Sequence, residues 1–583
     1  MEFPFRRSLI FAFLLICGSA TSLYAQLVVE NTPRWGFDGR VRLGQFNLLE
    51  IDVANSSDKP WQGDLKLQPM TGMAVDIPLL QPDLYIEPFG RRTIQFFPYI
   101  AQTTEFDFRW GRMFGTRFRA EDRLLIDEPK LVEYTAIVQL ISGDLATDRM
   151  DSIPGFDERS FPTSAAGLDG LGQVILNHVP PWSEAQQRAF LDWIYAGGKL
   201  ELFQQTTGKF PEFSGILSEL DEPSDKIPLG NGIVTRHGET IGQSKSKFKQ
   251  DRSNADRYPE WQVSNTVFPL LREMTQPDHN WPLIYLLAIS YLLLLFPGCW
   301  LLGRKRGDYR LTYGAILGLV LVFSFGFHTV GARGYGETTS VNSVALAKPA
   351  SNDRMIVTQV SNVFITSGGM YEIKHKTEGS IYSTGQIGES VLGAAYNRPV
   401  GAMVTDIPSF SSRSVVHAGV LQTPALRPEL VETAWNGSNP QLTFELTAGE
   451  EWSTDQLYGF AAYAGTSYPV RFEQGRIARL QGGGMKLSDF FNESTWRIYQ
   501  NFWDDKNYGR DELFRRSLYP LIAQDLNLMS HQQTQDFSLP EGEVRLYIFT
   551  KMPEAFFIQG EFSEQQHGHV LRVFKYQLDD TAG

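Results

Sequence analysis

The chain has 583 residues and a formal net charge of −13 at neutral pH. One hydrophobic core does not extend over such a length, so we expect about three or four folded units. The acidic balance argues against nucleic acid as a partner, because a phosphate backbone is bound through an excess of Lys and Arg.

Cysteine usage limits the chemistry further. The two cysteines, Cys17 and Cys299, both lie in strongly apolar segments. The remaining chain therefore offers no disulfide framework, no thiolate nucleophile and no Cys-based zinc site. The sequence predicts no metal centre and no cofactor.

The N-terminus has the layout of a secretory signal. Arg6 and Arg7 precede an apolar core from Leu9 to Ile16, and small residues follow as far as Ala25. A charged start, a short apolar core and a small-residue cleavage region are typical of signal peptides. We expect residues 1–25 to be a signal peptide and the remainder to be exported.

Residues 26–130 are expected to form a β-sandwich. Apolar and polar residues alternate in part over 46–53 and again over 63–67, and 55–60 between them is rich in turn formers. Short strands separated by Pro- and Gly-containing turns are typical of antiparallel sandwiches.

Residues 131–277 have the pattern of an α/β domain. Strands are predicted at 134–141, 171–179 and 199–203, and a helix at 183–196. Ser183 and Gln186 form a capping-box pattern, and Gly197-Gly198 supplies the helix stop. A strand, a helix and a strand with short connections indicate a βαβ unit and a parallel sheet.

Residues 278–333 are predicted to form a transmembrane helical hairpin. The runs 283–303 and 311–332 contain no Asp, Glu, Lys or Arg, and each is long enough to cross ~30 Å of hydrocarbon. The connector 304–310 carries four cations, Arg304, Lys305, Arg306 and Arg310. By the positive-inside rule, we therefore expect the connector to lie in the cytoplasm. We expect two spans in the bacterial cytoplasmic membrane, with both large parts extracytoplasmic.

Residues 334–583 are expected to form a β-rich extracytoplasmic domain. Strand patterns occur at 355–360, 442–446 and 544–549. A helical insertion is predicted near 487–528, where aromatic and aliphatic residues recur at three-to-five spacing. We interpret the aromatic cluster at 496–503 as the core of a small subdomain rather than as a partner-binding face.

Several short motifs carry a resemblance to the class I glutamine amidotransferase-like fold. They are Phe161-Pro162-Thr163, Gly167-Leu168-Asp169-Gly170-Leu171, Trp182-Ser183-Glu184 and Ala196-Gly197-Gly198-Lys199-Leu200. The whole chain resembles a group of bacterial two-span membrane proteins with a β-sandwich, a degenerate amidotransferase-like domain and a β-rich tail. The resemblance implies a flavodoxin-like fold for 131–277. It also implies an association with von Willebrand factor A-domain proteins and MoxR-type AAA+ ATPases.

The position of the nucleophile in that fold departs from the active families. The turn after the relevant strand is Gln204-Gln205-Thr206-Thr207, with neither Cys nor Ser. Without an activated thiol or hydroxyl, the glutaminase reaction has no first step. We therefore expect a non-catalytic, membrane-anchored scaffold or receptor-like component of an envelope complex, assisting assembly or maturation of envelope proteins. Its expected partners are the lipid bilayer and other membrane proteins, among them von Willebrand-type subunits, with a MoxR-type ATPase acting indirectly.

An enzyme or a small-ligand-binding module is the alternative. Ligands of open parallel sheets lie beyond the carboxyl ends of the strands. Asp144 and His178 are the weak catalytic candidates there, as acid and base of a hydrolase or lyase. The same crevice could instead bind a glycan or a small acid. Its other candidate residues are Ser142, Asp148, Gln204, Gln205 and Thr206.

Overall fold

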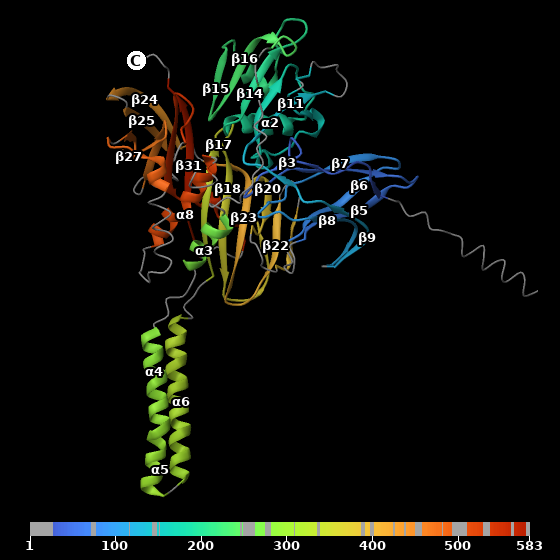
Figure 1. Cartoon of the computed structure of the whole chain (residues 1–583). Helices are drawn as coiled ribbons and strands as arrows, with labels where there is room; N and C mark the ends of the chain where they lie inside the picture. The colour runs from blue at the N-terminus through green and yellow to red at the C-terminus, as the bar shows by residue number, and fades with distance from the viewer. Residues whose placement is uncertain are drawn as a thin grey trace, which may run out of the picture.

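The computed structural model describes most of the chain outside the N-terminus. The described residues are 27–70, 77–115, 117–142, 149–150, 152–244, 248, 263–274, 281–307, 309–334, 339–385, 391–396, 401–423, 426–436, 439–448, 457–480, 482–491, 510–526, 528, 537–560 and 565–578. The predicted signal peptide and the aromatic cluster at 496–503 lie outside them. The protein is mostly β, with several sheets and a pair of long apolar helices (Figure 1).

A mixed, largely parallel sheet forms where the α/β pattern predicts it. Its strand order is β12-β11-β13-β14-β16-β15, parallel except for the antiparallel pair β15 and β16. The strand bounds are β11 Ala136–Ile141, β12 Gly155–Asp157, β13 Leu171–Leu176, β14 Lys199–Gln204, β15 Lys226–Leu229 and β16 Gly232–Thr240.

Helix α2 (Glu184–Tyr195) connects β13 to β14, and its start confirms the predicted capping box. The Ser183 hydroxyl accepts from the Gln186 backbone N–H, and the Gln186 side chain accepts from the Ser183 N–H. These bonds satisfy two N–H groups that a helix start leaves unpaired. Phe190 and Ile194 of α2 are fully buried against the apolar face of the sheet, which includes Leu200.

Two N-terminal sheets enclose a common core. Ile51 and Val53 of one sheet and Leu65, Leu67 and Phe108 of the other are fully buried in it. The first sheet contains β1 (Leu27–Val29), β2 (Arg34–Trp35), β4 (Leu49–Asn55) and β7 (Arg91–Phe96). The second contains β5 (Trp61–Pro69), β6 (Leu79–Ile86), β8 (Phe106–Phe114) and β9 (Arg117–Ile126). A short parallel pair, β3 (Arg40–Val41) and β10 (Lys130–Leu131), lies beside them.

The second of these sheets continues into strands from the other side of the hairpin. Strand β6 pairs in parallel with β21 (Gly393–Tyr396), with Leu79 opposite Ala395. The Ala395 N–H also donates to the Pro78 carbonyl at 2.9 Å. Beyond β21 the sheet adds β22 (Ala402–Ile407) and β19 (Gly369–Ile373). The chain segments before and after the hairpin therefore share one hydrogen-bonded sheet.

The largest sheet among the described residues is formed by the segment after the hairpin, as predicted for a β-rich domain (Figure 1). Its order is β20-β23-β18-β17-β31-β30-β26-β27-β28-β25-β24, and β29 pairs with β27. Its strands are β17 Ser340–Pro349, β18 Arg354–Ile365, β20 Glu378–Ser383, β23 Ser411–Gln422, β24 Leu426–Asn436, β25 Asn439–Ala448, β26 Tyr458–Tyr463, β27 Thr466–Glu473, β28 Ile477–Leu480, β29 Met485–Lys486, β30 Glu543–Lys551 and β31 Gln566–Gln577.

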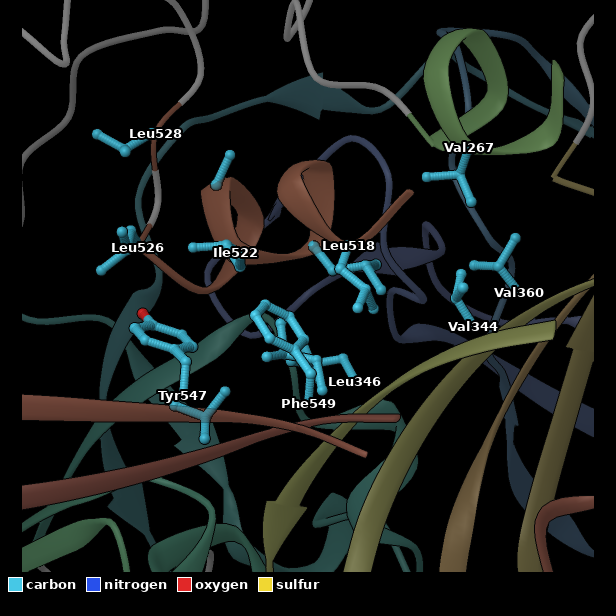
Figure 2. Close-up of a cluster of buried hydrophobic side chains, with 14 of the residues drawn as sticks. Val267, Val344, Leu346, Val360, Leu518, Ile522, Leu526, Leu528, Tyr547 and Phe549 are labelled. Atoms are coloured by element: carbon cyan, nitrogen blue, oxygen red, sulfur yellow. The ribbon is translucent and has the colours of Figure 1, made fainter. Parts of the chain in front are cut away.

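Two helices cover one face of this sheet. Helix α8 (Arg510–Asp525) comes from the predicted helical insertion, and α3 (Val263–Glu273) comes from the end of the α/β region. Figure 2 shows Leu518 and Ile522 of α8 directed toward Tyr547 and Phe549 of β30, in the same cluster as Val267 of α3. Helix α3 thus packs on the C-terminal sheet and on α8, and joins the α/β region to the C-terminal domain.

A buried ion pair adds to this connection. The Arg354 guanidinium of β18 donates to both carboxylate oxygens of Asp192 in α2, at 2.8 and 2.9 Å. The Ser351 N–H and hydroxyl donate to the same carboxylate at 3.0 and 2.5 Å. A buried charge is tolerated when it is paired and hydrogen-bonded, and Asp192 meets both conditions across the domain boundary.

The predicted hairpin is present as two long apolar helical segments. Within the described residues, the segments that are long and apolar enough to cross a membrane are Pro282–Lys305 and Tyr309–Val330, with mean hydropathies of 2.0 and 1.8. The first consists of α4 (Trp281–Leu293), η4 (Leu294–Cys299) and α5 (Trp300–Arg306), and the second is α6 (Tyr309–Gly334). Phe296 leaves the helical conformation just before Pro297, and a proline inside a helix typically kinks it. The pair projects away from the sheets and is largely unburied, which is compatible with a membrane hairpin (Figure 1).

Candidate functional site

The predicted ligand crevice lies at the carboxyl ends of β11, β13 and β14, which are neighbours in the sheet. Ser142 follows β11, His178 lies two residues after β13, and Gln204 ends β14. Gln205 opens a turn in which its N–H donates to the Lys209 carbonyl, and Thr206 is exposed. The structure therefore places these residues on one edge. Asp144 and Asp148 lie outside the described residues, so their role stays a prediction.

His178 has partners on both ring nitrogens. Its Nε2 lies 2.7 Å from the Glu158 carboxylate and its Nδ1 lies 3.0 Å from the Asn177 side-chain oxygen. The Trp182 indole N–H donates to the Glu158 carbonyl at 2.7 Å. His178 and Glu158 are both buried. The imidazole thus holds the Glu158 segment against the sheet, and sequence reasoning overlooked this carboxylate.

A charged cavity lies at the opposite edge of the same sheet. It has a volume of about 250 Å³ and is bordered by the residues that begin β13 and β14, including Gly172 and Lys199. Its other walls come from the β3–β4 loop, the loop before β13, helix α8 and the strands β17, β18, β30 and β31. Among the described lining residues, five are cationic and three are carboxylates. The cations are Arg42, Lys199, Lys348, Arg545 and Lys575, and the carboxylates are Asp169, Asp525 and Glu543.

Asp525 is the centre of the ion pairs in this cavity. Its carboxylate lies 3.0 Å from Arg545 and 3.2 Å from Lys348, and it accepts a hydrogen bond from the Tyr547 hydroxyl at 2.9 Å. Burial alone would raise the pKa of Asp525, but Lys348 and Arg545 together hold that pKa well below its usual range. Arg545 also donates to the Asp525 carbonyl at 2.8 Å. It thereby caps the last turn of α8, where a cation complements the helix dipole.

Lys575 borders the same cavity from β31, and its charge, unlike that of Asp525, is not balanced by a close ion pair with a described residue. Burial, and after it the nearby Arg545, lower the pKa of Lys575 from 10.5 to about 7. Burial also lowers the pKa of Arg42 to about 10 and raises the pKa of Asp169, each shift being opposed by the other residue's charge. The cavity therefore combines a stable ion-pair network around Asp525 with a lysine whose charge is poorly compensated.

No local sequence signal identifies this cavity. Its lining residues come from the N-terminal sheets, the α/β region and the segment after the hairpin, and in sequence most of them stand alone or in pairs. Two of the resemblance segments border it: Gly167-Leu168-Asp169-Gly170-Leu171 contributes Leu168, Asp169 and Leu171, and Ala196-Gly197-Gly198-Lys199-Leu200 contributes its first four residues. Neither segment by itself indicates a cavity. Within the described residues, no group of three or more His, Cys, Asp or Glu side chains is placed to hold a metal ion.

Comparisons with known proteins add little to this geometry. No protein-family model matches the chain, and no curated protein matches it. Among solved structures, it is similar to a cycloisomaltooligosaccharide glucanotransferase from Paenibacillus sp. in complex with cycloisomaltoheptaose. That match has 6% identity and a TM-score of 0.15, and covers 79% of this chain and 99% of the other. A likeness this weak carries no argument about fold or activity.

Proposed function

We propose that the protein is a non-catalytic, membrane-anchored scaffold or receptor-like component of an envelope complex in the bacterial cytoplasmic membrane. The observation that supports this best is the parallel pairing of β6 with β21, which joins the segments before and after the hairpin in one sheet. A hairpin that emerges from such a joined body holds it at the membrane surface by two anchors. This arrangement suits a platform on which other envelope proteins assemble.

The candidate catalytic residues give the scaffold role further support. Gln204, Gln205 and Thr206 occupy the position where the active amidotransferase-like families carry a nucleophile. None of the three is an activated thiol or serine hydroxyl. His178 is engaged by Glu158 and Asn177 rather than facing an open crevice. In this proposal the region 131–277 is a degenerate amidotransferase-like domain of flavodoxin-like type, kept for docking.

The proposed partners follow from the resemblance. They are von Willebrand factor A-domain membrane subunits, with a MoxR-type ATPase coupled indirectly. The connector 304–310 is only seven residues long, so it offers a cytosolic ATPase little surface. Coupling would pass through another membrane subunit. Crosslinking that captured the ATPase without any membrane protein would contradict this part of the proposal.

A pull-down tests the scaffold role. The tagged full-length protein would be purified in mild detergent from its native membrane and its companions identified by mass spectrometry. The hairpin 278–333 alone, carrying the same tag, controls for proteins that follow any apolar helix pair. We expect stoichiometric recovery of at least one membrane subunit with the full chain and not with the hairpin. A monodisperse protein without companions would refute the scaffold role.

A further inference from the structure

The charged cavity has two features that ion pairing within the protein leaves unexplained. The first is the Lys575 ammonium. Gly197 lines the same cavity, and a Cβ at that position would lie only 2.8 Å from the Lys575 Nζ, which places the nitrogen against the glycine. Within the described residues, no carboxylate lies at ion-pair distance from this nitrogen. Lys575 is only partly exposed, and a charge that is largely withdrawn from water without a partner is costly unless something binds it.

The second feature is the side chain of Gln45, which has only 7% of its surface exposed. Its Oε1 is buried and accepts no hydrogen bond from any described residue. The backbone around it is fixed, because the Gln45 carbonyl accepts from the Ile100 N–H at 3.0 Å and from the Asn47 amide at 2.9 Å. A buried acceptor left without a donor costs about 1–3 kcal/mol, so such groups normally have a partner.

The size and charge of the cavity limit what could bind there. A volume of about 250 Å³ corresponds to about eight waters at ~30 Å³ each. It is smaller than the ~300–1,000 Å³ pockets that hold drug-sized ligands. This volume therefore favours a small ligand over a nucleotide or an oligosaccharide. Even with Lys575 only partly protonated near pH 7, the described lining has more cationic than acidic residues, so an anion is favoured over a neutral molecule.

The cations also indicate the kind of anion. Arg545 is committed to Asp525 and to Glu543, whose carboxylate lies 2.7 Å from its Nε. It is therefore not free to bind a phosphate in the bidentate manner that Arg favours. Lys575 offers a single positive charge, which the one negative charge of a carboxylate balances better than the nearly two charges of a phosphate at neutral pH. Gln45 adds the requirement that the ligand carry a hydrogen-bond donor.

We propose that this cavity binds a small carboxylate that also bears hydroxyl groups, with its carboxylate on Lys575 and a hydroxyl donating to Gln45. The ligand supplies partners for the Lys575 ammonium and the Gln45 side-chain oxygen, which the fold leaves without them. It also touches walls from the N-terminal sheets, the α/β region and the segment after the hairpin, so that binding favours their joined arrangement.

Calorimetric titration of the purified full-length protein in detergent tests this site, with small acids in matched pairs. Malate and succinate differ by one hydroxyl group, and gluconate and sorbitol differ by the carboxylate. We expect malate or gluconate to bind with a Kd on the order of 1 mM or tighter. Succinate should bind at least about tenfold more weakly than malate, and sorbitol should give no heat. Absence of heat from every acid at ~10 mM, or binding of inorganic phosphate alone, would overturn the proposal.

Variants separate the two contacts. Lys575→Met should weaken the binding of the hydroxy acid by about tenfold or more, whereas Lys226→Met, at an exposed lysine outside the cavity, should leave it unchanged. Gln45→Leu should remove the preference for malate over succinate without weakening succinate. If Lys575→Met does not fold, the binding measurements on Gln45→Leu are sufficient to test the site. An unchanged malate preference in Gln45→Leu would contradict the site. The titration is independent of the pull-down, so either proposal can fail while the other stands.

Discussion

The Asp192 carboxylate and the Arg354 guanidinium are withdrawn from water, with 2% and 8% of their side chains exposed. Burial raises the pKa of Asp192, and the Ser351 hydrogen bond and the Arg354 charge oppose that rise. Without Asp192, the remaining ion-pair partner of Arg354 is the exposed Glu378 carboxylate 3.5 Å away, and breaking a buried pair in this way costs about 3–5 kcal/mol. We expect Asp192→Ala to lower the free energy of unfolding by about this amount, measured by urea denaturation of the purified protein with tryptophan fluorescence.

A control for this prediction lies on the same helix. Glu184 and Arg188 form an exposed pair, with 75% and 42% of their side chains accessible. Solvent screens such pairs, which contribute about 0.5 kcal/mol or less. Glu184→Ala should therefore leave the urea midpoint nearly unchanged. Equal effects of the two substitutions would show that the buried pair does not stabilise the junction between α2 and β18.

Lys575 predicts a pH dependence of a definite sign. Its pKa falls from 10.5 to about 7 on folding, through burial and the charges of Arg545 and Lys348, against Asp525 and Glu543. Between these two values the unfolded chain keeps a proton that the folded chain has lost. The unfolded state then binds more protons, so the contribution of this group to stability rises with pH from 7 to 10.5.

Replacing Lys575 with methionine should remove this pH dependence. One pKa unit corresponds to about 1.4 kcal/mol, and the residual solvent contact of the side chain reduces the total to about 1–3 kcal/mol. We expect Lys575→Met to be more stable than the natural protein at pH 7 and nearly equal to it at pH 10, by urea midpoint. Lys226→Met should follow the natural protein at both values. A constant difference between Lys575→Met and the natural protein would contradict the buried position of this charge.

At the scale of elements, the contact between β6 and β21 can be tested directly. Leu79 and Ala395 are opposite each other in parallel strands. The only cysteines are Cys17 and Cys299, so both would be replaced by alanine before Leu79→Cys and Ala395→Cys are introduced. A protease site in the connector 304–310 would then separate the two halves. We expect the oxidised double variant to remain one species on a non-reducing gel after cleavage.

The matched controls are the two single cysteine variants, which should separate into two fragments with or without reductant. Separation of the double variant under oxidising conditions would contradict the shared sheet. The same gel run with reductant confirms that cleavage was complete.

Local signals in the sequence were sufficient to predict α2 and its neighbouring strands. Ser183, Gln186 and Gly197-Gly198 act within one helix turn, so the structure reproduces the predicted start and end of α2 nearly residue for residue. The helical hairpin could be predicted equally well, because two apolar runs and a basic connector can be recognised in the sequence without knowledge of their tertiary contacts. Leu518 and Ile522 of the predicted insertion are buried, as their spacing suggested.

The pairing of strands that are distant in the sequence could not be predicted from local signals. Only Leu79-Leu80 and Ala395-Tyr396 are in register between β6 and β21, and neither dipeptide distinguishes this partner from any other edge strand. The cavity was missed for the same reason. Lys575, Gln45 and Asp525 come from three distant segments, and nothing in the local pattern around each of them indicates that they meet. Reasoning from the parallel sheet pointed to its carboxyl edge, whereas the described cavity borders its amino edge.

For the whole molecule, the shared sheet constrains the membrane topology. Strands β6 and β21 lie on opposite sides of the hairpin in sequence and pair in space. Two crossings return the chain to the side it left, whereas one crossing would separate these strands by the bilayer. The pairing thus agrees with a double span, and the four cations in 304–310 predict that the connector is on the cytoplasmic side.

Cysteine labelling tests that orientation. Lys305 and Ser224 are both exposed, one in the connector region and the other in the α/β region. In a background without Cys17 and Cys299, a membrane-impermeant maleimide should label Ser224→Cys in intact spheroplasts. It should label Lys305→Cys only after permeabilisation, because positive charges beside a span remain on the cytoplasmic side. Labelling of both in intact spheroplasts would mean that the apolar pair does not cross the membrane. The reverse pattern would place the cavity and the sheets in the cytoplasm, where an envelope scaffold could not act.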